Sequence, residues 1–101
     1  MIKKQYLKSK PLCKVTFEVP AQAAAEAQSI CVVGDFNGWD TTALPMKRKK
    51  DGSFFATVSL ETGRDYQFRY LFDGENWQND SEADRYMPSP YGNCENCVVE
   101  V

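Results

Sequence analysis

Apolar and polar residues alternate in three segments of this sequence, and this period of two constrains the fold more than any other feature. From residue 66 to residue 72 every second residue is aromatic, with Gln, Arg and Leu between them. Residues 13–19 (CKVTFEV) and 54–60 (FFATVSL) alternate in the same way. Since successive side chains of a β-strand point to opposite faces, each segment predicts a strand with one buried face. We expect the aromatic face of 66–72 to lie in the core.

Turn-forming dipeptides such as Asn37-Gly38 and Asp51-Gly52 divide the rest of the chain into short segments. Further strands are predicted at residues 29–34, 44–48 and 97–101 and around Trp77. Pro45 places 44–48 at a sheet edge, and the alanine-rich residues 21–28 are treated as a connection. About seven short strands without a strong helix predict an all-β fold, an immunoglobulin-like antiparallel β-sandwich.

The length of 101 residues is enough for one domain with a modest core. A net charge of −2 gives the whole chain no attraction to nucleic acid or to an anionic membrane, so we expect neither as a partner. We interpret the basic run 47–50 as a solvated hairpin end. The positive start is not followed by the apolar stretch of a signal peptide, and we therefore predict a cytoplasmic protein with free cysteine thiols.

The sequence contains no histidine, which removes the usual general base, the histidine-activated nucleophiles and most zinc sites. A cluster of carboxylates could in principle hydrolyse a glycosidic bond; it comprises Asp73, Glu75, Asp80, Glu82 and Asp84. These residues stand among Gly, Asn, Ser and Gln, without the apolar surroundings that raise the pKa of a catalytic acid. Their spacing does not match a calcium-binding loop. We predict no catalytic activity, no metal and no cofactor.

The segment Cys94-Glu95-Asn96-Cys97 has the CxxC spacing of redox and metal motifs. A thioredoxin-like motif opens a helix, however, whereas this one precedes the last predicted strand. A zinc site would require Cys13 and Cys31 to converge with it in space. The spacing is therefore weak evidence for chemistry, and Cys13 is better explained as a small buried apolar side chain.

Trp39 and Trp77 are the two tryptophans of the chain, and both stand in polar turns beside Asn, Gly, Asp and Gln. These surroundings favour indole rings that are presented to a ligand with flat apolar faces and many hydroxyls, which describes a sugar. Arg69 points away from the aromatic face of its strand, so its guanidinium could reach hydroxyls of the same ligand. The alternative is that both rings cap the ends of the sandwich.

Three motifs give the chain a family resemblance: VVGDFNGWD at 32–40, FRYLFDGENWQND at 68–80 and EADRYMPSPYGNCENCVVEV at 82–101. They closely resemble carbohydrate-binding module family 48, the glycogen-binding modules of isoamylases, glycogen branching enzymes and the beta subunit of AMP-activated protein kinase. The resemblance implies an immunoglobulin-like β-sandwich and extends from about residue 12 to the end. We therefore expect residues 1–11 to be an N-terminal tail and 12–101 to form the glycogen-binding domain.

The resemblance also implies a binding site. In the family two tryptophans stack on α-1,4-linked glucose, and they correspond to Trp39 and Trp77. A basic residue corresponds to Arg69, and an asparagine before the last strand corresponds to Asn96. The apolar residue that enters the glucan coil in the kinase subunit has its nearest counterpart at Tyr91, with Gly92 as the alternative, and Cys94 falls roughly where the family has threonine or another small residue.

We accordingly predict a non-catalytic module whose partner is an α-glucan polysaccharide or a malto-oligosaccharide. The alternative is an interaction module that docks onto a separate glycogen-metabolising enzyme or kinase, with its glucan site weak or lost. Exposed sheet edges can serve such docking. Both tryptophans and Arg69 are present, which favours the first prediction.

Overall fold

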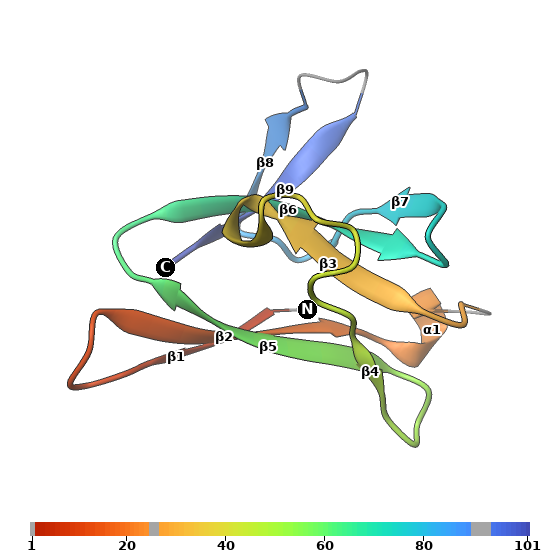
Figure 1. The fold of residues 1–101 in the computed structure, drawn as a ribbon, viewed down its shortest axis with the longest axis horizontal. Helices are drawn as coiled ribbons and strands as arrows, with labels where there is room; N and C mark the ends of the chain where they lie inside the picture. Colours follow the sequence, from red (N-terminus) through yellow and green to blue (C-terminus); the bar gives the residue numbers. More distant parts are fainter. Residues whose placement is uncertain (1, 25–26, 90–93) are drawn as a thin grey trace.

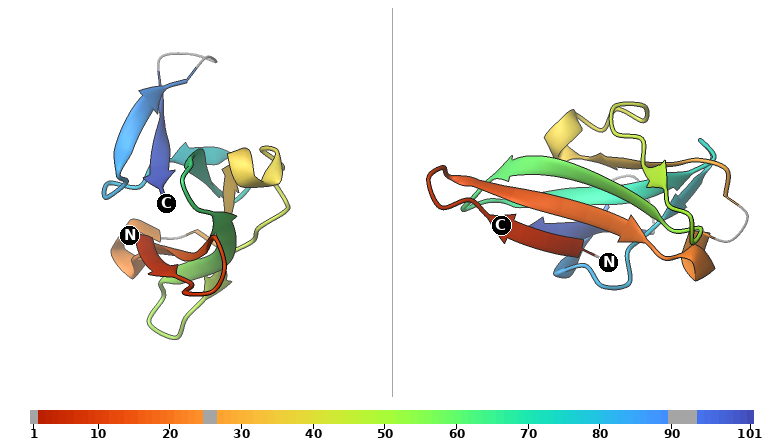
Figure 2. Two further views of the ribbon diagram at one scale, coloured as in Figure 1. Left: turned by 90° about the vertical axis from the view of Figure 1, so that its left-hand side faces the viewer. Right: turned by 90° about the horizontal axis from the view of Figure 1, so that it is seen from below.

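The protein consists of two antiparallel sheets packed face to face (Figures 1 and 2). Its structure is a computed structural model, which describes residues 2–24, 27–89 and 94–101. One sheet has four strands in the order β1 (Ile2–Tyr6), β2 (Leu12–Val19), β5 (Phe54–Glu61) and β4 (Lys47–Arg48). The other contains β3 (Ile30–Gly34), β6 (Asp65–Phe72), β9 (Glu95–Glu100) and β8 (Arg85–Pro88) in this order, and β7 (Asn76–Gln78) also pairs with β6. The all-β sandwich is confirmed.

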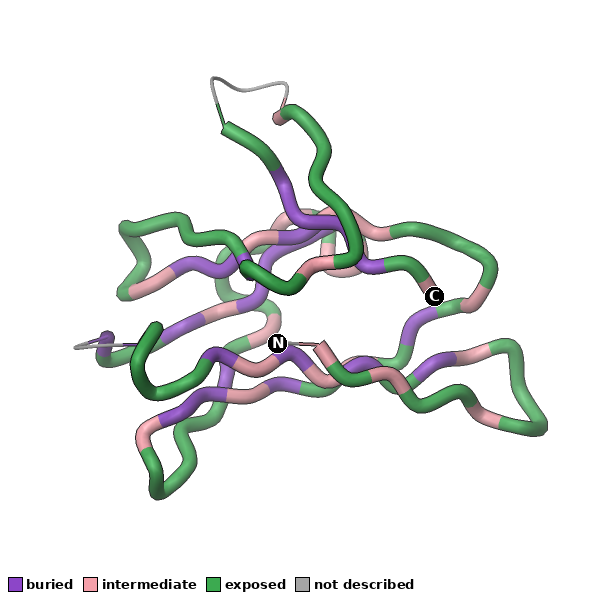
Figure 3. The backbone as a smooth tube through the Cα atoms, turned by 180° about the vertical axis from the view of Figure 1, so that it is seen from behind, coloured by how far each residue is buried: buried purple, intermediate pink, exposed green. Residues whose placement is uncertain are grey.

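The core lies between the two sheets, where the predicted alternating faces meet (Figure 3). On β2 the buried side chains occupy alternate positions from Cys13 to Val19, and on β6 Phe68 and Tyr70 are buried while Tyr66 and Phe72 pack against the same cluster. The aromatic face of residues 66–72 is therefore core, as predicted. The ring of Phe17 lies 4.8 Å from that of Phe68, centre to centre, and this contact ties the sheets together.

Two strands were not predicted from the sequence, so the described residues form nine strands instead of about seven. β1 pairs along its whole length with β2, and the segment expected as an N-terminal tail therefore carries an edge strand. β8 is the other unpredicted strand, and all four of its residues are exposed. Both lie at sheet edges and bury little surface, so neither shows a clear period of two.

The only other regular elements of the described residues are short. A four-residue helix, α1 (Ala21–Ala24), follows β2 within the segment treated as a connection. A single 3₁₀ turn, η1 (Asp35–Asn37), follows β3 and ends at Gly38, whose φ of 66° is left-handed. No helix among the described residues is both long and apolar enough to cross a membrane.

The segment from Leu44 to Arg48 crosses from one sheet to the other. The Leu44 carbonyl accepts a hydrogen bond from the Val32 N–H at 3.0 Å, and the Met46 N–H donates to the Ile30 carbonyl at 2.8 Å. The chain then joins the four-stranded sheet as β4, whose residues pair with β5. β4 is an edge strand, as Pro45 predicted.

The outer face of the five-stranded sheet is the surface that carries most of the predicted site. Strand alternation turns Gln67, Arg69 and Leu71 of β6 to this face, opposite to the aromatic core. Trp77 of β7 lies directly beside Leu71 in the antiparallel register. Phe68 pairs with Cys97, which places Asn96 next to Arg69 on neighbouring strands.

Candidate functional site

A pocket of about 780 Å³ on this outer face contains four of the residues predicted for the site. Those four are Trp39, Arg69, Trp77 and Asn96, and the remaining lining residues are Asp35, Gly38, Thr41, Gln67, Ser89 and Cys94. They come from the loop after β3, from β6 and β7, and from the β8–β9 hairpin, which all lie on the upper side of the sandwich in Figure 1. The fold thus brings together residues more than fifty positions apart in the sequence.

Arg69 is held against the wall of this pocket. Its Nε donates to Asn79 Oδ1 at 2.7 Å, and Asn79 Nδ2 donates in turn to the Glu95 carbonyl at 2.9 Å. The guanidinium carbon lies 5.8 Å from the centre of the Trp77 ring, within the range of a cation–π contact. Nη1 lies 3.7 Å from Cys94 Sγ. These contacts fix the guanidinium beside the indole and orient its donors along the pocket.

Trp77 is presented from the short strand β7 and is 39% exposed. The turn before it has left-handed backbone at Asp73 (φ 53°) and Gly74 (φ 70°). The Asp73 carboxylate accepts hydrogen bonds from the N–H groups of Gln28 at 2.7 Å and Ser29 at 3.0 Å. Asp73 therefore anchors the turn that presents the indole, a role that the sequence did not indicate.

Trp39 is less exposed than predicted: it is half-buried, and its indole Nε1 donates to Asp35 Oδ1 at 2.9 Å. Its backbone is also unusual, because φ is 60° directly after the left-handed Gly38. A bulky residue in this conformation costs about 1–3 kcal/mol, and such strain concentrates at functional sites. The N–H of Trp39 donates to the Gly34 carbonyl at 2.9 Å, which holds the strained turn against the end of β3.

A chain of hydrogen bonds connects Trp39 with Asn96 across the floor of the pocket. Asp35 accepts from the Trp39 indole with one carboxylate oxygen and from the Gln67 N–H with the other, at 2.8 Å. Gln67 Oε1 accepts from Asn96 Nδ2 at 3.1 Å, and Asn96 is only 6% exposed. Sequence reasoning missed Asp35 and Gln67, although Asp35 lies four residues before Trp39 within the motif at 32–40.

A family model described as carbohydrate-binding module 48 (isoamylase N-terminal domain) matches residues 11–92 of the chain. The chain belongs to this family of carbohydrate-binding modules. Of its relatives, a 1,4-alpha-glucan branching enzyme of Butyrivibrio fibrisolvens is 33% identical over 63 residues, which cover 62% of this chain and 10% of the enzyme. A second 1,4-alpha-glucan branching enzyme, from Xanthomonas campestris, is 37% identical over 49 residues, 48% of this chain and 7% of the enzyme. The chain thus spans a tenth or less of the curated relatives it matches.

The two cysteines of the CxxC segment face different sides of the module. Cys94 is exposed and lines the pocket beside Arg69, whereas Cys97 is buried in the core. Cys97 Sγ accepts a hydrogen bond from the Asp80 N–H at 3.1 Å, and burial raises the pKa of the Cys97 thiol to about 11. The spacing therefore does not bring the two thiols together, since Cys94 precedes β9 at the surface while Cys97 lies within β9 and faces the core.

The clustered carboxylates of the sequence are distributed among separate partners in the module. Asp80 is 4% exposed and accepts from the Tyr70 hydroxyl at 2.7 Å, while burial raises the pKa of that phenol well above its usual value. Asp84 accepts from Lys4 Nζ at 2.6 Å and from the Glu100 N–H at 2.7 Å. Within residues 2–24, 27–89 and 94–101, no three His, Cys, Asp or Glu side chains are grouped so as to hold a metal ion. Tyr91 and Gly92, the two remaining residues predicted for the site, lie outside the described residues.

Proposed function

We propose that this carbohydrate-binding module binds α-1,4-linked glucan, as glycogen, starch or malto-oligosaccharide, in the pocket on the outer face of the five-stranded sheet. The observation that carries the proposal is the convergence of two indoles and one guanidinium on this pocket. Trp39 and Trp77 stack on the faces of glucose rings, and Arg69 donates hydrogen bonds to their hydroxyls. The module has no catalytic activity of its own.

The chemistry of the pocket suits such a ligand. A glucose ring exposes C–H groups on its faces and hydroxyls at its edges, so an exposed indole and fixed polar donors are complementary to it. Trp77 supplies the exposed face, and Arg69 stands 5.8 Å from its ring centre. Asn96 lies at the floor of the pocket, where its side-chain amide donates a hydrogen bond to Gln67. Tyr91 is a further proposed contact with the glucan, because the family resemblance implies it.

The choice of an α-1,4-glucan is supported by the relatives, which are named as 1,4-alpha-glucan branching enzymes. Because the pocket is open to solvent, affinity for one short oligosaccharide is expected between about micromolar and millimolar, or roughly −8 to −4 kcal/mol. The free thiols of the four cysteines fit the reducing cytoplasm, where the module would act beside a separate glycogen-metabolising enzyme or kinase.

Titration with maltoheptaose, followed by tryptophan fluorescence and amide NMR shifts, tests the proposal, with cellohexaose as the control sugar. We expect saturable shifts centred on Trp39, Trp77 and Arg69 for the α-glucan alone. Trp77→Ala should weaken binding at least about tenfold, which corresponds to about 1.4 kcal/mol, because it removes the exposed stacking face.

Tyr6→Ala is the matched variant, because Tyr6 is an exposed aromatic residue (56%) on the four-stranded sheet, away from the pocket. It should bind maltoheptaose as the parent does, and both variants should melt close to the parent. An equal response to cellohexaose would contradict the proposal. So would the absence of any response at about 10 mM maltoheptaose, a concentration above the highest dissociation constant expected.

A further inference from the structure

Charge is divided unequally between the two sheets. Residues 2–19 and 47–61, which supply the four-stranded sheet and its hairpin turns, contain nine Lys and Arg residues against three Asp and Glu residues. The rest of the chain contains three basic residues against eleven acidic ones. The small net charge of −2 therefore conceals a basic half and an acidic half, a property that composition alone did not reveal.

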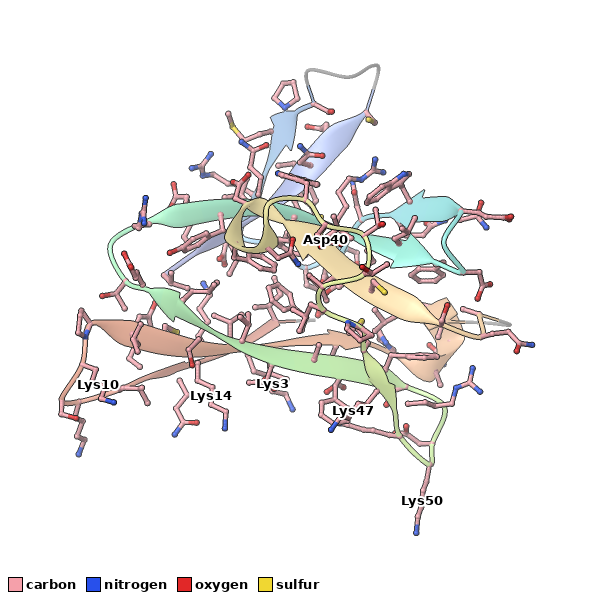
Figure 4. All side chains as sticks on the ribbon, viewed as in Figure 1. Lys3, Lys10, Lys14, Asp40, Lys47 and Lys50 are labelled. Atoms are coloured by element: carbon pink, nitrogen blue, oxygen red, sulfur yellow. The ribbon has the colours of Figure 1, made fainter. Side chains whose placement is uncertain are left out.

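The basic half presents several of its lysines on one surface. Lys3 of β1, Lys14 of β2 and Lys47 of β4 are exposed and lie on the outer side of the sheet, away from the core. Figure 4 shows all three below the sheet, with Lys10 and Lys50 at its two ends pointing the same way. We refer to these five residues as the lysine face.

Little on the module neutralises the lysine face. Among the described residues, ion pairs reach only Lys3 of these five, whose Nζ lies 3.9 Å from a Glu18 carboxylate oxygen. That same oxygen is closer to Lys49, at 3.2 Å. Asp51, at the hairpin turn, accepts hydrogen bonds from the N–H and hydroxyl of Ser53 and keeps its negative charge, but the three carboxylates of this half are outnumbered by its nine Lys and Arg residues. The face thus carries a net positive charge that a partner can complement.

The side chains of the face indicate what kind of partner fits. Arg48 turns away from it, donates to the Ala27 carbonyl and lies over the Phe54 ring at 4.8 Å, so the face offers ammonium groups without a guanidinium fork for phosphates. Phe55 is half-buried with Lys49 Nζ 5.3 Å from its ring centre. No large apolar side chain described as exposed belongs to this face, so it has none to stack on a base or enter a bilayer.

Hydroxyl groups fill the space between the lysines. Thr16 and Thr57 lie opposite each other in the register with their Oγ1 atoms 3.1 Å apart, and Ser59 lies opposite Lys14. Ammonium groups interspersed with hydroxyls complement carboxylates and peptide groups. We propose that the lysine face docks onto a protein surface rich in aspartate and glutamate.

The position of this face determines how such a complex is arranged. The lysine face and the pocket lie on opposite outer sides of the sandwich: the labelled lysines point away below the four-stranded sheet in Figure 4, whereas the residues that line the pocket come from the five-stranded sheet and its loops. An acidic partner would repel the acidic half, so only one side of the module can approach it. Docking therefore leaves the pocket uncovered, and the proposal does not depend on which sugar the pocket binds.

Poly-L-glutamate serves as the probe, titrated into the whole chain at about 50 mM salt, where screening of surface charges is moderate. We expect saturable amide NMR shifts within residues 3–16 and 47–59, and weakening as salt is raised. The triple variant Lys3→Gln, Lys14→Gln, Lys47→Gln should lose at least about tenfold in affinity, which is about 1.4 kcal/mol. The matched Lys→Arg triple variant keeps the charge and should bind as the parent does.

Three outcomes would overturn the proposal. The first is the absence of saturable shifts, or shifts that map to the pocket. The second is binding of poly-L-glutamate by the Lys→Gln triple variant with the affinity of the parent, once melting curves have shown that the variant is folded. The third is tighter binding, at the same salt, to vesicles with about 30% phosphatidylserine or to single-stranded DNA, because these ligands probe the same positive charge without a protein surface.

Discussion

Replacing Gly34 by alanine should destabilise this module strongly, and for a reason unrelated to backbone conformation. Gly34 is buried at the end of β3 with φ −170° and ψ −171°, which is extended backbone that any residue adopts. A Cβ built there would lie 2.5 Å from the Gln67 carbonyl oxygen and 2.8 Å from Phe68 Cβ. The first of these atoms is backbone, so rotation of a side chain cannot remove the clash.

The free-energy cost of Gly34→Ala follows from the separation of β3 and β6 that it requires. Gly34 and Phe68 are direct partners in the β3–β6 register, and the Gln67 N–H is bonded to Asp35, so the two strands must separate where the pocket floor is built. Overpacking of a dense interior costs about 1–3 kcal/mol, and we expect the upper end, about 3 kcal/mol. For a domain of this size that corresponds to a melting temperature lower by roughly 12–24 °C.

Gly63→Ala is the control, because it makes the same chemical change with open space around the new atom. Gly63 has φ 76°, and no heavy atom lies within 4 Å of the Cβ position. Gly63→Ala should therefore lower the free energy of unfolding by only about 1 kcal/mol, the cost of a side chain on left-handed backbone. Urea denaturation of both variants gives the comparison. If Gly34→Ala costs no more than Gly63→Ala, the inference from atomic spacing to stability is refuted.

Two further predictions concern carboxylates. Asp35→Ala removes the acceptor shared by the Trp39 indole and the Gln67 N–H, so calorimetric titration with maltoheptaose should show a loss of about tenfold, or about 1.4 kcal/mol, with the fold retained; unchanged affinity would show that Asp35 does not position Trp39. Burial opposes ionisation of Asp84, but its bonds from the Glu100 N–H and Lys4 hold the pKa of Asp84 below its usual range. The stabilisation is therefore present above the unfolded pKa near 4 and is lost as pH falls through the lower folded pKa. Asp84→Asn should be less stable than the parent in urea at pH 7, and the difference should shrink as the pH falls below about 4; a difference that does not change with pH would contradict the assignment.

Three of the predicted strands, β2, β5 and β6, have one buried face. Alternation along β2, β5 and β6 identified them because each strand packs one side on the core. β1 and β8 escaped prediction because edge strands bury little on either face, so their residues carry no such constraint. The crossing at Leu44–Arg48 also escaped prediction, since a segment that pairs with both sheets has the local sequence of an ordinary short strand.

The site was predictable in its aromatic and cationic parts, and less so in what supports them. Trp39, Arg69 and Trp77 stand out by residue type, and the structure gathers them at one pocket. Asp35 and Gln67 are ordinary polar residues whose importance comes from tertiary hydrogen bonds between distant strands. Local sequence contains no signal for such contacts, and the degree to which Trp39 is buried depends on them.

The crossing segment also governs how the sandwich comes apart. Since Leu44 and Met46 are bonded to β3 while the next two residues are bonded to β5, neither sheet can peel away without breaking hydrogen bonds of the other. Opening of one layer therefore also breaks hydrogen bonds of the other, and this coupling favours all-or-none unfolding in a small domain. The crossing segment follows the loop that contains Trp39. This loop is hydrogen-bonded to β3 at both ends, through the Gly34 carbonyl at Trp39 and through the Val32 N–H at Leu44. Both ends of the loop that carries Trp39 are therefore positioned on β3 before any ligand binds.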